Sequence, residues 1–586
     1  MRLLLPATRE NTNAARRARG TLRVFALLLL IGTGIAYTIG SAVLGAIPQP
    51  QPDDRRDDDT GPGEHDPADE HDGHAGDAAH DRRGADSNVE LSPYPPLPGG
   101  EAPAEPGVDD QPVHLAEGPS ALSPTQVAVA VVLLAGLAIG LTFATLATAV
   151  IANTAVVTFF CASNVMKLVL TNRGLRDNSA ITVSRRELAT LADQDLPLYT
   201  ILLPVFHEAS ILRQLVDGVE ALEYPQHLLD VKLLLEVDDD ETRRAAEDMA
   251  LPPCFDVVVV PDVGPRGKPR ACNVGLARAK GELLVIYDAE DRPEPDQLRK
   301  SVCAFRRVDP RVVCLQAKLN YFNRSHNLLT RWFTAEYSVW FDQLLPGLQS
   351  SDVAIPLGGT SNHFRTESLR ELGGWDAYNV TEDADLGLRI YVEGWKTAVL
   401  DTTTYEEATS RYRNWIRQRS RWVKGYMQTW LFHMRHPVRL ARAMGPRAFI
   451  VFQLFFGACT ICLLVNPIYW ALTGLWFATH MGWIQSVFPR PLLYAGTIAL
   501  FVGNGACVLL ALSGAFGRRN YGDVKWALLV PFYWLLMSVA AYKALSQLFY
   551  KPSYWEKTEH GHCRYDDEDV RPLGFDAPGP VLAAAE

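Results

Sequence analysis

The feature that most constrains this chain is a set of long apolar runs that carry almost no charge. An α-helix needs about 20 residues to cross the apolar core of a bilayer, and every run reaches that length. The runs are Val24–Ile47, Gln126–Leu170, Phe449–Thr479, Leu492–Ala515 and Trp526–Leu548. Between the second and third runs lies a long stretch of ordinary soluble composition. We therefore predict a membrane protein with a soluble domain between two groups of apolar helices.

The chain before the second run divides into a basic start, an apolar segment and an acidic linker. Arginines precede Val24–Ile47, which favours a cytoplasmic N-terminus by the positive-inside rule. Small residues near Ala46 would also suit a cleaved signal peptide, but the run is long for one, and we favour an anchor. Residues 48–123 are rich in Pro, Gly, Asp and Glu, which is typical of a disordered linker. Much of the net charge of −11 belongs to this linker, and we expect no nucleic-acid partner.

From Leu196 onward, short apolar strands alternate with helical patterns. The predicted strands are Tyr199–Val205, Val231–Val237, Val257–Val260 and Leu283–Tyr287, and the predicted helices are Ala209–Leu222, Glu241–Met249 and Pro269–Lys280. Such alternation is typical of an α/β fold with a mostly parallel sheet. Ligands bind such sheets at the carboxyl ends of the strands. We therefore looked for chemistry in the residues that follow each strand.

Polar and acidic residues follow the strands at four places. They are Pro204–Glu208, Glu236–Asp240, Gly267–Asn273 and Asp288–Asp291. Two carboxylates spaced two residues apart at a strand end can bind a divalent ion. Acids after a strand also cap the next helix, and capping alone would account for one of Asp238 and Asp239.

Two further motifs lie nearer the third apolar run. Thr381-Glu382-Asp383 stands before an amphipathic helix (Leu386–Val392), where an ionised aspartate can accept a proton or simply cap the helix. A strand at Thr397–Leu400 and a basic, aromatic segment from Tyr412 follow. That segment ends in Gln418, Arg421 and Trp422, whose spacing puts them on one helix face. An amide, a permanent cation and an indole on one face suit a diphosphate and a sugar ring.

These motifs, in this order from Pro204 to Trp422, resemble the processive glycosyltransferases of family 2, the cellulose, chitin and hyaluronan synthases. The resemblance implies a GT-A catalytic domain, Rossmann-like with a mostly parallel sheet, flanked by transmembrane α-helices. The sequence departs from the family pattern at Phe206 and His207, which stand where the family has Tyr-Asn. The element that begins at Lys268 is two residues longer than in the family, and Glu290 takes the second position of the Asp-x-Asp motif.

The resemblance also implies a role for each motif. Asp383 would be the general base, with Glu382 beside it, and a Mg²⁺ or Mn²⁺ ion would bind Asp288 and either Glu290 or Asp291. The implied donor-binding residues are Glu208, Asp238, Asp239, Lys268 and Asp288. Gln418 and Arg421 would face the diphosphate, and Trp422 would pack against the terminal sugar of the acceptor. A segment with Trp555, Lys557 and Thr558 loosely resembles a family element that would gate the donor pocket.

A nucleotide-sugar enzyme needs its active site in the cytoplasm, and this requirement guides the predicted topology. We expect one crossing near Val127–Ile151 with an interfacial helix at Asn153–Leu170, rather than two crossings. After the domain we expect four spans rather than three, with a hairpin that turns at Asn466-Pro467. The predicted regions are 1–47 (tail and first span), 48–125 (disordered acidic extracytoplasmic linker), 126–190 (second span and interfacial helix), 191–436 (GT-A domain), 437–550 (membrane and interfacial helices) and 551–586 (cytoplasmic tail).

The predicted function is an inverting hexosyl transfer from a UDP-sugar to a growing β-linked polysaccharide. We expect a multi-pass protein of the bacterial inner membrane, with a cytoplasmic catalytic domain and export subunits in the periplasm or outer membrane as partners. One alternative is a non-processive transferase that glycosylates a lipid. Another, from a different class, is a non-catalytic membrane receptor that binds a nucleotide sugar.

Overall fold

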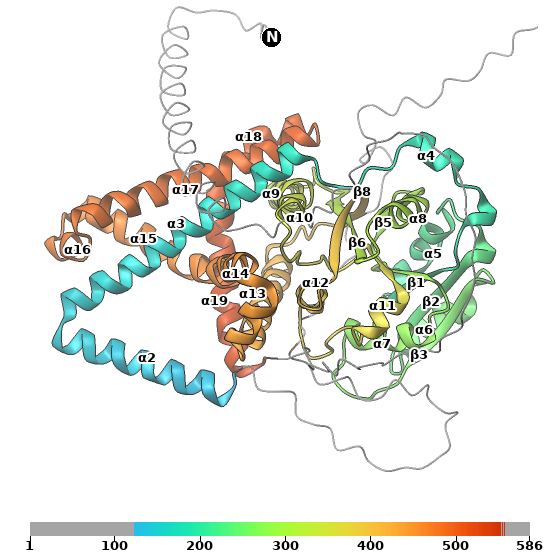
Figure 1. Ribbon diagram of the computed structural model, residues 1–586, viewed down its shortest axis with the longest axis horizontal. Helices are drawn as coiled ribbons and strands as arrows, with labels where there is room; N and C mark the ends of the chain where they lie inside the picture. Colours follow the sequence, from blue (N-terminus) through green and yellow to red (C-terminus); the bar gives the residue numbers. More distant parts are fainter. Residues whose placement is uncertain (1–121, 553, 555, 557–586) are drawn as a thin grey trace, which may run out of the picture.

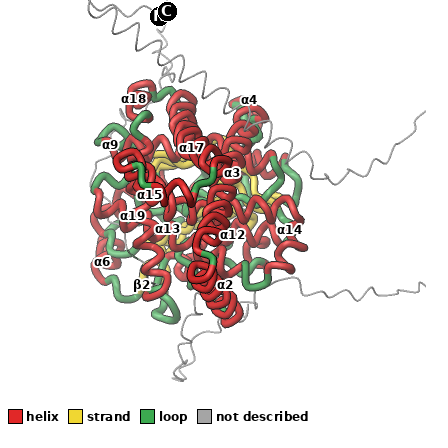
Figure 2. The backbone as a smooth tube through the Cα atoms, turned by 90° about the vertical axis from the view of Figure 1, so that its left-hand side faces the viewer, coloured by secondary structure: helices red, strands yellow, loops and turns green. Residues whose placement is uncertain are grey.

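The computed structural model describes residues 122–552, 554 and 556, which form a sheet domain joined to a bundle of long helices (Figure 1). The predicted anchor, most of the predicted linker, Trp555, Lys557 and Thr558 lie outside the described residues. Seen from the side of the helices, strands lie behind a face made of helices (Figure 2). The chain therefore separates a soluble α/β domain from an apolar helical part, as the sequence predicts.

The soluble domain is built on a mixed sheet of eight strands in the order β3-β2-β1-β4-β7-β6-β8-β5. The first four strands in the chain pair in parallel, whereas β7 pairs antiparallel with both β4 and β6. Its elements are α4 (Arg185–Thr190), η1 (Asp193–Asp195), β1 (Tyr199–Val205), η2 (Ala209–Ile211), α5 (Leu212–Glu220), η3 (Gln226–Leu228), β2 (Leu229–Glu236), α6 (Asp240–Asp248), β3 (Phe255–Val260), α7 (Lys268–Arg278), β4 (Leu283–Ile286), β5 (Arg292–Pro293), α8 (Gln297–Arg307), β6 (Val312–Tyr321), β7 (Asn362–Arg365), α11 (Thr366–Glu371), α12 (Glu382–Val392) and β8 (Lys396–Glu406).

The central strands form because their sequences are nearly continuous apolar runs. Every residue of β2 and β4 is buried, as expected for strands covered on both faces. One face carries a core with Leu215 of α5 and Leu298 of α8, and the other a core with Leu276 of α7 and Leu386 of α12. This is the GT-A-like arrangement that the sequence predicts, and the four predicted strands are confirmed.

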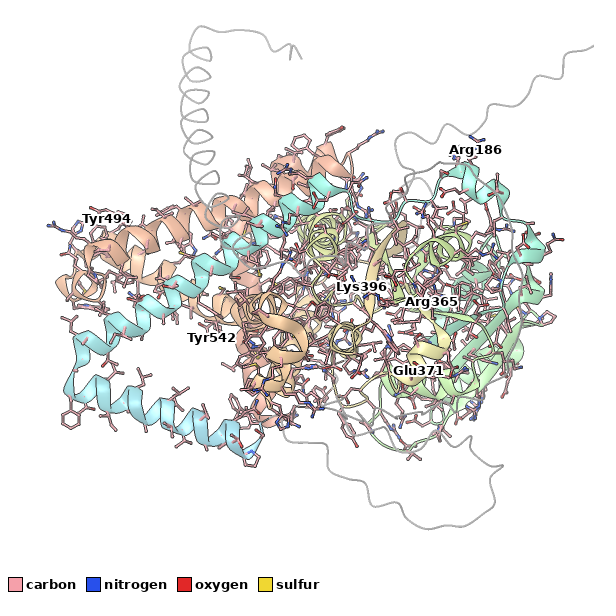
Figure 3. All side chains as sticks on the ribbon, in the orientation of Figure 1. Arg186, Arg365, Glu371, Lys396, Tyr494 and Tyr542 are labelled. Atoms are coloured by element: carbon pink, nitrogen blue, oxygen red, sulfur yellow. The ribbon has the colours of Figure 1, made fainter. Side chains whose placement is uncertain are left out.

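The helical part contains α2 (Pro124–Phe143), α3 (Thr145–Asp177), α9 (Leu328–Val339), η4 (Trp340–Leu344), α10 (Leu345–Ser350), α13 (Tyr412–His433), α14 (Pro437–Phe452), η5 (Gln453–Gly457), α15 (Ala458–Thr479), α16 (Gly482–Val487), α17 (Arg490–Gly517), η6 (Tyr521–Asp523), α18 (Val524–Ala527) and α19 (Val530–Tyr550). Among the described residues, four helices are long and apolar enough to cross a membrane: α2, α3, α17 and Thr460–Thr479 of α15. In Figure 3, Tyr494 marks the end of the helical part that is away from the sheet domain, and Arg186 and Arg365 lie in the sheet domain on the right.

The second apolar run forms two helices, each long and apolar enough to cross a membrane, where we predicted one crossing near Val127–Ile151. The helix breaks at Ala144, and α2 and α3 meet there at the end away from the sheet (Figure 1). The other ends of both helices lie near the sheet domain. Gln126 Nε2 donates to the Leu431 carbonyl at 2.6 Å, and Ser179 Oγ, just after α3, donates to the Pro346 carbonyl at 2.6 Å. Apolar composition predicted enough length for two passes, but it did not show where the chain reverses.

The predicted hairpin at Asn466-Pro467 is also wrong, because α15 continues through Pro467. A proline inside a helix frees a carbonyl in the preceding turn, and neighbouring helices in apolar surroundings can supply a new donor. Pro467 leaves the Leu463 carbonyl without its N–H partner, and the Tyr542 hydroxyl of α19 donates to the neighbouring Leu464 carbonyl. The chain therefore reverses after Thr479, through α16, and returns along α17.

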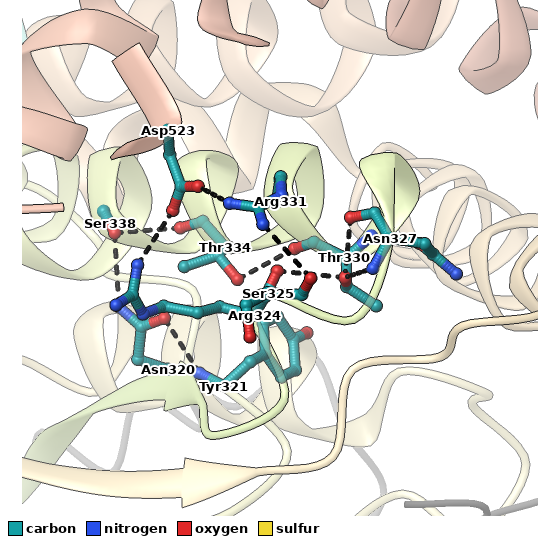
Figure 4. A network of polar contacts seen from close by, with 10 residues as sticks. All are labelled: Asn320, Tyr321, Arg324, Ser325, Asn327, Thr330, Arg331, Thr334, Ser338 and Asp523. Atoms are coloured by element: carbon teal, nitrogen blue, oxygen red, sulfur yellow. Dashed lines mark hydrogen bonds and ion pairs between the residues drawn. The ribbon is translucent and has the colours of Figure 1, made fainter. Parts of the chain in front are cut away.

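The segment after α17 lies beside the sheet domain. Among the described helices after that domain, Thr460–Thr479, α17 and at most one bent pair are long and apolar enough to cross a membrane, where we predicted four spans. Arg518 forms a bidentate ion pair with Asp342 at 2.6 and 2.9 Å. Asp523 is buried and pairs with Arg324, at 3.1 Å, and with Arg331, in a polar network that joins η6 to α9 (Figure 4).

The far end of α19 also returns to this side, since Lys424 of α13 donates to the Lys551 carbonyl at 3.2 Å. The bent pair of helices, Tyr521–Ala527 and Val530–Tyr550, therefore begins and ends beside the sheet domain.

Candidate active site

A cavity of ≈ 560 Å³ opens between the carboxyl ends of the strands and helices α12 and α13. Its walls contain most of the candidate site residues: Glu208, Lys268, Asp288, Glu290, Glu382, Asp383, Gln418, Arg421 and Trp422. These residues are up to 214 positions apart in the chain, from Glu208 to Trp422. The strand ends and the two helices thus bring the separate motifs to one place.

The acidic turn after β4 divides its carboxylates between the cavity and the protein interior. Asp288 and Glu290 line the cavity, whereas Asp291 is 2 % exposed. The Asp288 backbone N–H donates to Asp291 Oδ2 at 2.7 Å, and the Thr360 hydroxyl donates to the same oxygen. Asp291 therefore fixes the turn, which leaves Glu290 as the better placed companion of Asp288.

Lys268 ties this turn to a loop on the opposite wall of the cavity. Its Nζ donates to Asp288 and, at 2.6 Å, to the Gly359 carbonyl. A Cβ on Gly359 would lie 3.3 Å from Asp383 Oδ2, so this loop approaches the proposed base closely. The interaction with Asp288 keeps Lys268 protonated, with a pKa above its ordinary value despite burial. Lys268 thus places a positive charge between Asp288 and Asp383.

The acids after β2 do not all reach the cavity. Asp239 is fully buried, accepts from the His207 backbone N–H at 2.5 Å and caps α6 through the Thr242 backbone N–H at 3.1 Å. Asp238 is part exposed and pairs with Arg266 at 2.5 Å, outside the cavity wall. Glu236 does line the cavity. The capping explanation therefore fits Asp239, and the donor-binding roles of Asp238 and Asp239 remain predictions that this geometry does not favour.

Asp383 lies in the first turn of α12, where the aligned backbone N–H groups favour negative charge. Its Oδ1 accepts the Ala384 N–H at 2.7 Å. Burial raises the pKa of Asp383 to about 6, although Lys268 and Arg421 oppose this rise. Burial and the charge of Asp383 raise the pKa of Glu382 to about 7. A carboxylate with a pKa slightly below neutral is well matched to accept a proton in neutral solution.

Helix α13 packs directly on the start of α12 and presents its motif to the cavity. Gly425 allows this contact, since a Cβ there would lie 2.2 Å from Thr381 Oγ1. Gln418 is held by the Thr409 hydroxyl, which donates to its Oε1 at 3.1 Å. The Trp422 ring stacks on Tyr337, with centroids 6.2 Å apart and an angle of 27° between planes. The positive charge of Arg421 is attracted by the carboxylates of the cavity.

A second cavity, of ≈ 220 Å³, extends from the same site into the helical part. Its lining is rich in aromatic side chains, which include Tyr337, Trp422 and Tyr426, and it reaches α15, α17 and α19. Asp383 and Trp422 line both this cavity and the larger one. The proposed base therefore lies on the wall that the two cavities share.

Sequence reasoning missed several residues of this site. Glu406, at the end of β8, and Tyr554 both line the larger cavity. Burial and the charges of the acidic turn raise the pKa of Glu406 well above its usual value. Arg419, inside the Gln418–Trp422 motif, is buried against Glu336 and the Tyr533 hydroxyl. The position of Glu406 at the end of a strand could have indicated a site residue. No pattern in the sequence near Glu336 or Arg419 indicates that these two residues form a pair.

The carboxylate oxygens of this turn suit a divalent ion, but they supply only some of its ligands. No group of three or more His, Cys, Asp or Glu side chains in the described part of the chain is arranged to hold a metal by itself. The turn nevertheless concentrates carboxylates. Burial, together with the charges of Asp288 and Glu290, raises the pKa of Asp291 well above its usual value. Carboxylate oxygens suit Mg²⁺ or Mn²⁺, and Mg²⁺ commonly takes one or two carboxylates with substrate phosphates.

Comparison with known proteins agrees with this geometry. Residues 197–425 match the family described as Glycosyltransferase like family 2. The chain is 26% identical over 307 residues to the probable glycosyltransferase YdaM of Bacillus subtilis, a match that covers 50% of this chain and 72% of the relative. It is 23% identical over 386 residues to a beta-monoglucosyldiacylglycerol synthase of Synechocystis, covering 64% of this chain and 77% of the relative.

Two further matches are to a plant enzyme and to a solved structure. Glucomannan 4-beta-mannosyltransferase 2 of Arabidopsis thaliana is 26% identical over 281 residues, which is 45% of this chain and about half (51%) of that relative. Among solved structures, the mannosyltransferase PcManGT of Pyrobaculum calidifontis in complex with GDP-Man and Mn²⁺ matches with a TM-score of 0.44 and 19% identity, over 69% of this chain and 99% of that one.

The family match spans β1 to α13, and so includes both the strand-end motifs and the helix that carries Arg421. The fold and the family model agree on the same residues. Residues 197–425 are therefore similar to the glycosyltransferases of family 2, over the region that carries the candidate site.

Proposed function

We propose that this protein is an inverting glycosyltransferase that moves a sugar from a UDP-sugar to an acceptor held at the membrane. The observation that carries the proposal is the position of Asp383 on the wall between a polar cavity and an aromatic one. The polar cavity suits a nucleotide diphosphate, because it gathers Lys268 and Arg421 beside the acidic turn. The aromatic cavity suits the acceptor end, because flat side chains pack against sugar rings.

In the proposed reaction, Asp383 removes the proton of the acceptor hydroxyl. The acceptor oxygen then forms a bond to the anomeric carbon while the bond from that carbon to the diphosphate oxygen breaks. The leaving diphosphate keeps the electron pair, and Lys268, Gln418 and Arg421 stabilise its charge. One displacement inverts the anomeric centre, so an α-linked donor gives a β-linked product.

Asp288 and Glu290 would hold the divalent ion in the proposed site. When bound, the ion supplies positive charge that neutralises the donor diphosphate. The residues of the chain prepare this site before any ligand binds. Asp291 and Thr360 fix the turn, and Lys268 partly balances its negative charge.

We propose a growing β-linked glycan as the acceptor, made at the bacterial inner membrane by a multi-pass protein with a cytoplasmic catalytic domain. The aromatic lining around Trp422 supports a sugar unit as the occupant of the acceptor cavity. Export subunits in the periplasm or outer membrane would then receive the product. Arg518 and Lys525 lie near the catalytic side, which supports a cytoplasmic placement by the positive-inside rule.

A lipid acceptor is the second candidate, and the position of the aromatic cavity favours it. The cavity reaches Leu463 of α15 and Leu510 of α17, two helices that are long and apolar enough to cross a membrane. One relative is named as a beta-monoglucosyldiacylglycerol synthase. A lipid acceptor would receive a single sugar, whereas a glycan acceptor would be extended repeatedly.

Product analysis with purified full-length protein in nanodiscs tests both candidates. The protein is supplied with UDP-sugars and Mn²⁺, with and without diacylglycerol, and the products are sized. We expect turnover that Asp383→Asn abolishes and that Glu371→Gln, an exposed control on α11, leaves unchanged. A polymeric product supports the first candidate, and a product limited to one sugar on lipid supports the second. Hydrolysis of donor with no product in either case contradicts both.

A further inference from the structure

A separate cavity of ≈ 470 Å³ lies in the part of the helical bundle away from the catalytic site. It is enclosed by α3, α15, α16 and α17, and none of its lining residues lines either cavity of the active site. Its volume falls within the range of about 300–1,000 Å³ that is usual for ligand pockets. Most of its walls are apolar, including Val157, Phe488 and Leu493.

Two polar groups of this cavity are not matched within the described structure. Trp476 Nε1 and Asn466 Oδ1 both line it as buried atoms with no hydrogen-bond partner among the described residues. A buried unpaired donor such as the indole N–H is costly and is normally satisfied by a ligand or water. An oxygen-bearing ligand would satisfy Trp476. The Asn466 amide can rotate to offer either its oxygen or its nitrogen.

The positive charge of Arg490 is a second, independent indication that this cavity binds a ligand. Arg490 lines the same cavity at the start of α17. The stretches 124–166 and 458–517, which form most of α2, α3 and α15–α17, contain no Asp or Glu and no Lys, and Arg490 is their one arginine. Arg490 stands at the end of α17 opposite Arg518, which pairs with Asp342 on the catalytic side. Arg490 is exposed, and an arginine at this end of the helices attracts an anionic lipid headgroup.

We propose that this cavity binds one anionic phospholipid of the leaflet away from the catalytic domain. An acyl chain fills the apolar space, Arg490 pairs with the phosphate, and the Trp476 N–H donates to an ester carbonyl. Three of the helices that line the cavity, α3, α15 and α17, are long and apolar enough to cross a membrane, so lipid would surround the cavity. The site is distinct from the acceptor cavity and does not depend on the identity of the transferred sugar.

Photo-crosslinking with a defined lipid tests the proposal on the full-length protein in nanodiscs. The probe is a phosphatidylglycerol with a diazirine in one acyl chain, and the matched probe is the phosphatidylcholine analogue. Labelled peptides are mapped by mass spectrometry. We expect the anionic probe to label 466–500 at least fivefold more than the zwitterionic one.

Two variants and one control make the test specific. Gly496→Leu fills the cavity, where an added Cβ meets only Val157 and Phe488 at 3.8 and 4.0 Å, and Arg490→Gln removes the charge at an exposed position. Both should lower labelling of 466–500 at least fivefold, whereas Arg442→Gln, an exposed arginine of α14, should not change it. Equal labelling by the two probes, or labelling of 466–500 that neither variant lowers, would overturn the proposal. Arg490→Gln keeps the test decisive even where Gly496→Leu fails to fold.

Discussion

The acid limb of the pH profile gives a quantitative test of the proposed base. The pKa of Asp383 is raised to about 6 by burial, and only the ionised carboxylate can accept a proton. Activity must therefore be lost as the pH falls through this value. With a pKa of about 6, about 97% of Asp383 is ionised at pH 7.5 and about 9% at pH 5. The account predicts that kcat/KM at pH 5 is about tenfold lower than at pH 7.5.

The assay is nucleotide release by the purified protein between pH 4.5 and 8.5, with kcat/KM measured at each pH. Glu382 is the alternative candidate for the general base, and its pKa is raised to about 7. If Glu382 were the base, the limb would centre near pH 7 and would vanish in Glu382→Gln. We expect Glu382→Gln to keep a limb near pH 6. Asp383→Asn should lose about 10²–10⁴-fold in kcat, the usual range for removal of a general base. A limb centred below pH 4.5 would refute the reasoning, because the base would then be an unperturbed carboxylate.

Three other predictions concern the metal, the buried ion pair and the topology. Asp288→Asn should raise the Mn²⁺ concentration for half-maximal activity by about 10–100-fold, measured by metal titration, and an unchanged requirement would place the ion elsewhere. Arg419→Met should destabilise the protein by about 3 kcal/mol in denaturant unfolding, because it leaves half-buried Glu336 without its cation. Glu336→Leu in the same chain should restore most of the loss. In a cysteine-free background, Gly482→Cys and Gly517→Cys should react with an impermeant maleimide from opposite sides of the membrane, and both positions have open space for a side chain. Labelling of both from one side would contradict the path of α17.

Much of the soluble domain could be predicted because its signals are local. A strand such as Leu283–Ile286 is a short apolar run, and the acidic turn that follows it marks its carboxyl end. Since parallel strands share that edge, the strand-end rule predicted that the polar and acidic residues after the strands would gather where a ligand binds. The spacing of Gln418, Arg421 and Trp422 likewise predicted one helix face. These residues do line one cavity, although their roles in the reaction remain predictions.

The membrane arrangement could not be predicted in the same way, because apolar composition gives length without direction. The reversal at Ala144 and the continuous path through Pro467 depend on contacts with other helices. Sequence patterns also do not reveal long-range pairs such as Glu336 with Arg419 or Arg518 with Asp342. The acids after β2 could be interpreted as a helix cap or as donor-binding residues. The burial of Asp239 and its hydrogen bond to the Thr242 N–H favour the cap.

The most direct test of the central claim is the release of UDP from a panel of UDP-sugars, with Mn²⁺ or Mg²⁺, by the nanodisc-held protein and by its Asp383→Asn variant. The account predicts turnover with at least one donor, a β-linked product by NMR, and loss of turnover in the variant. Tight binding of donors without turnover by the native protein would instead support a receptor. Equal turnover by the native protein and Asp383→Asn would contradict Asp383 as the base on which the mechanism depends.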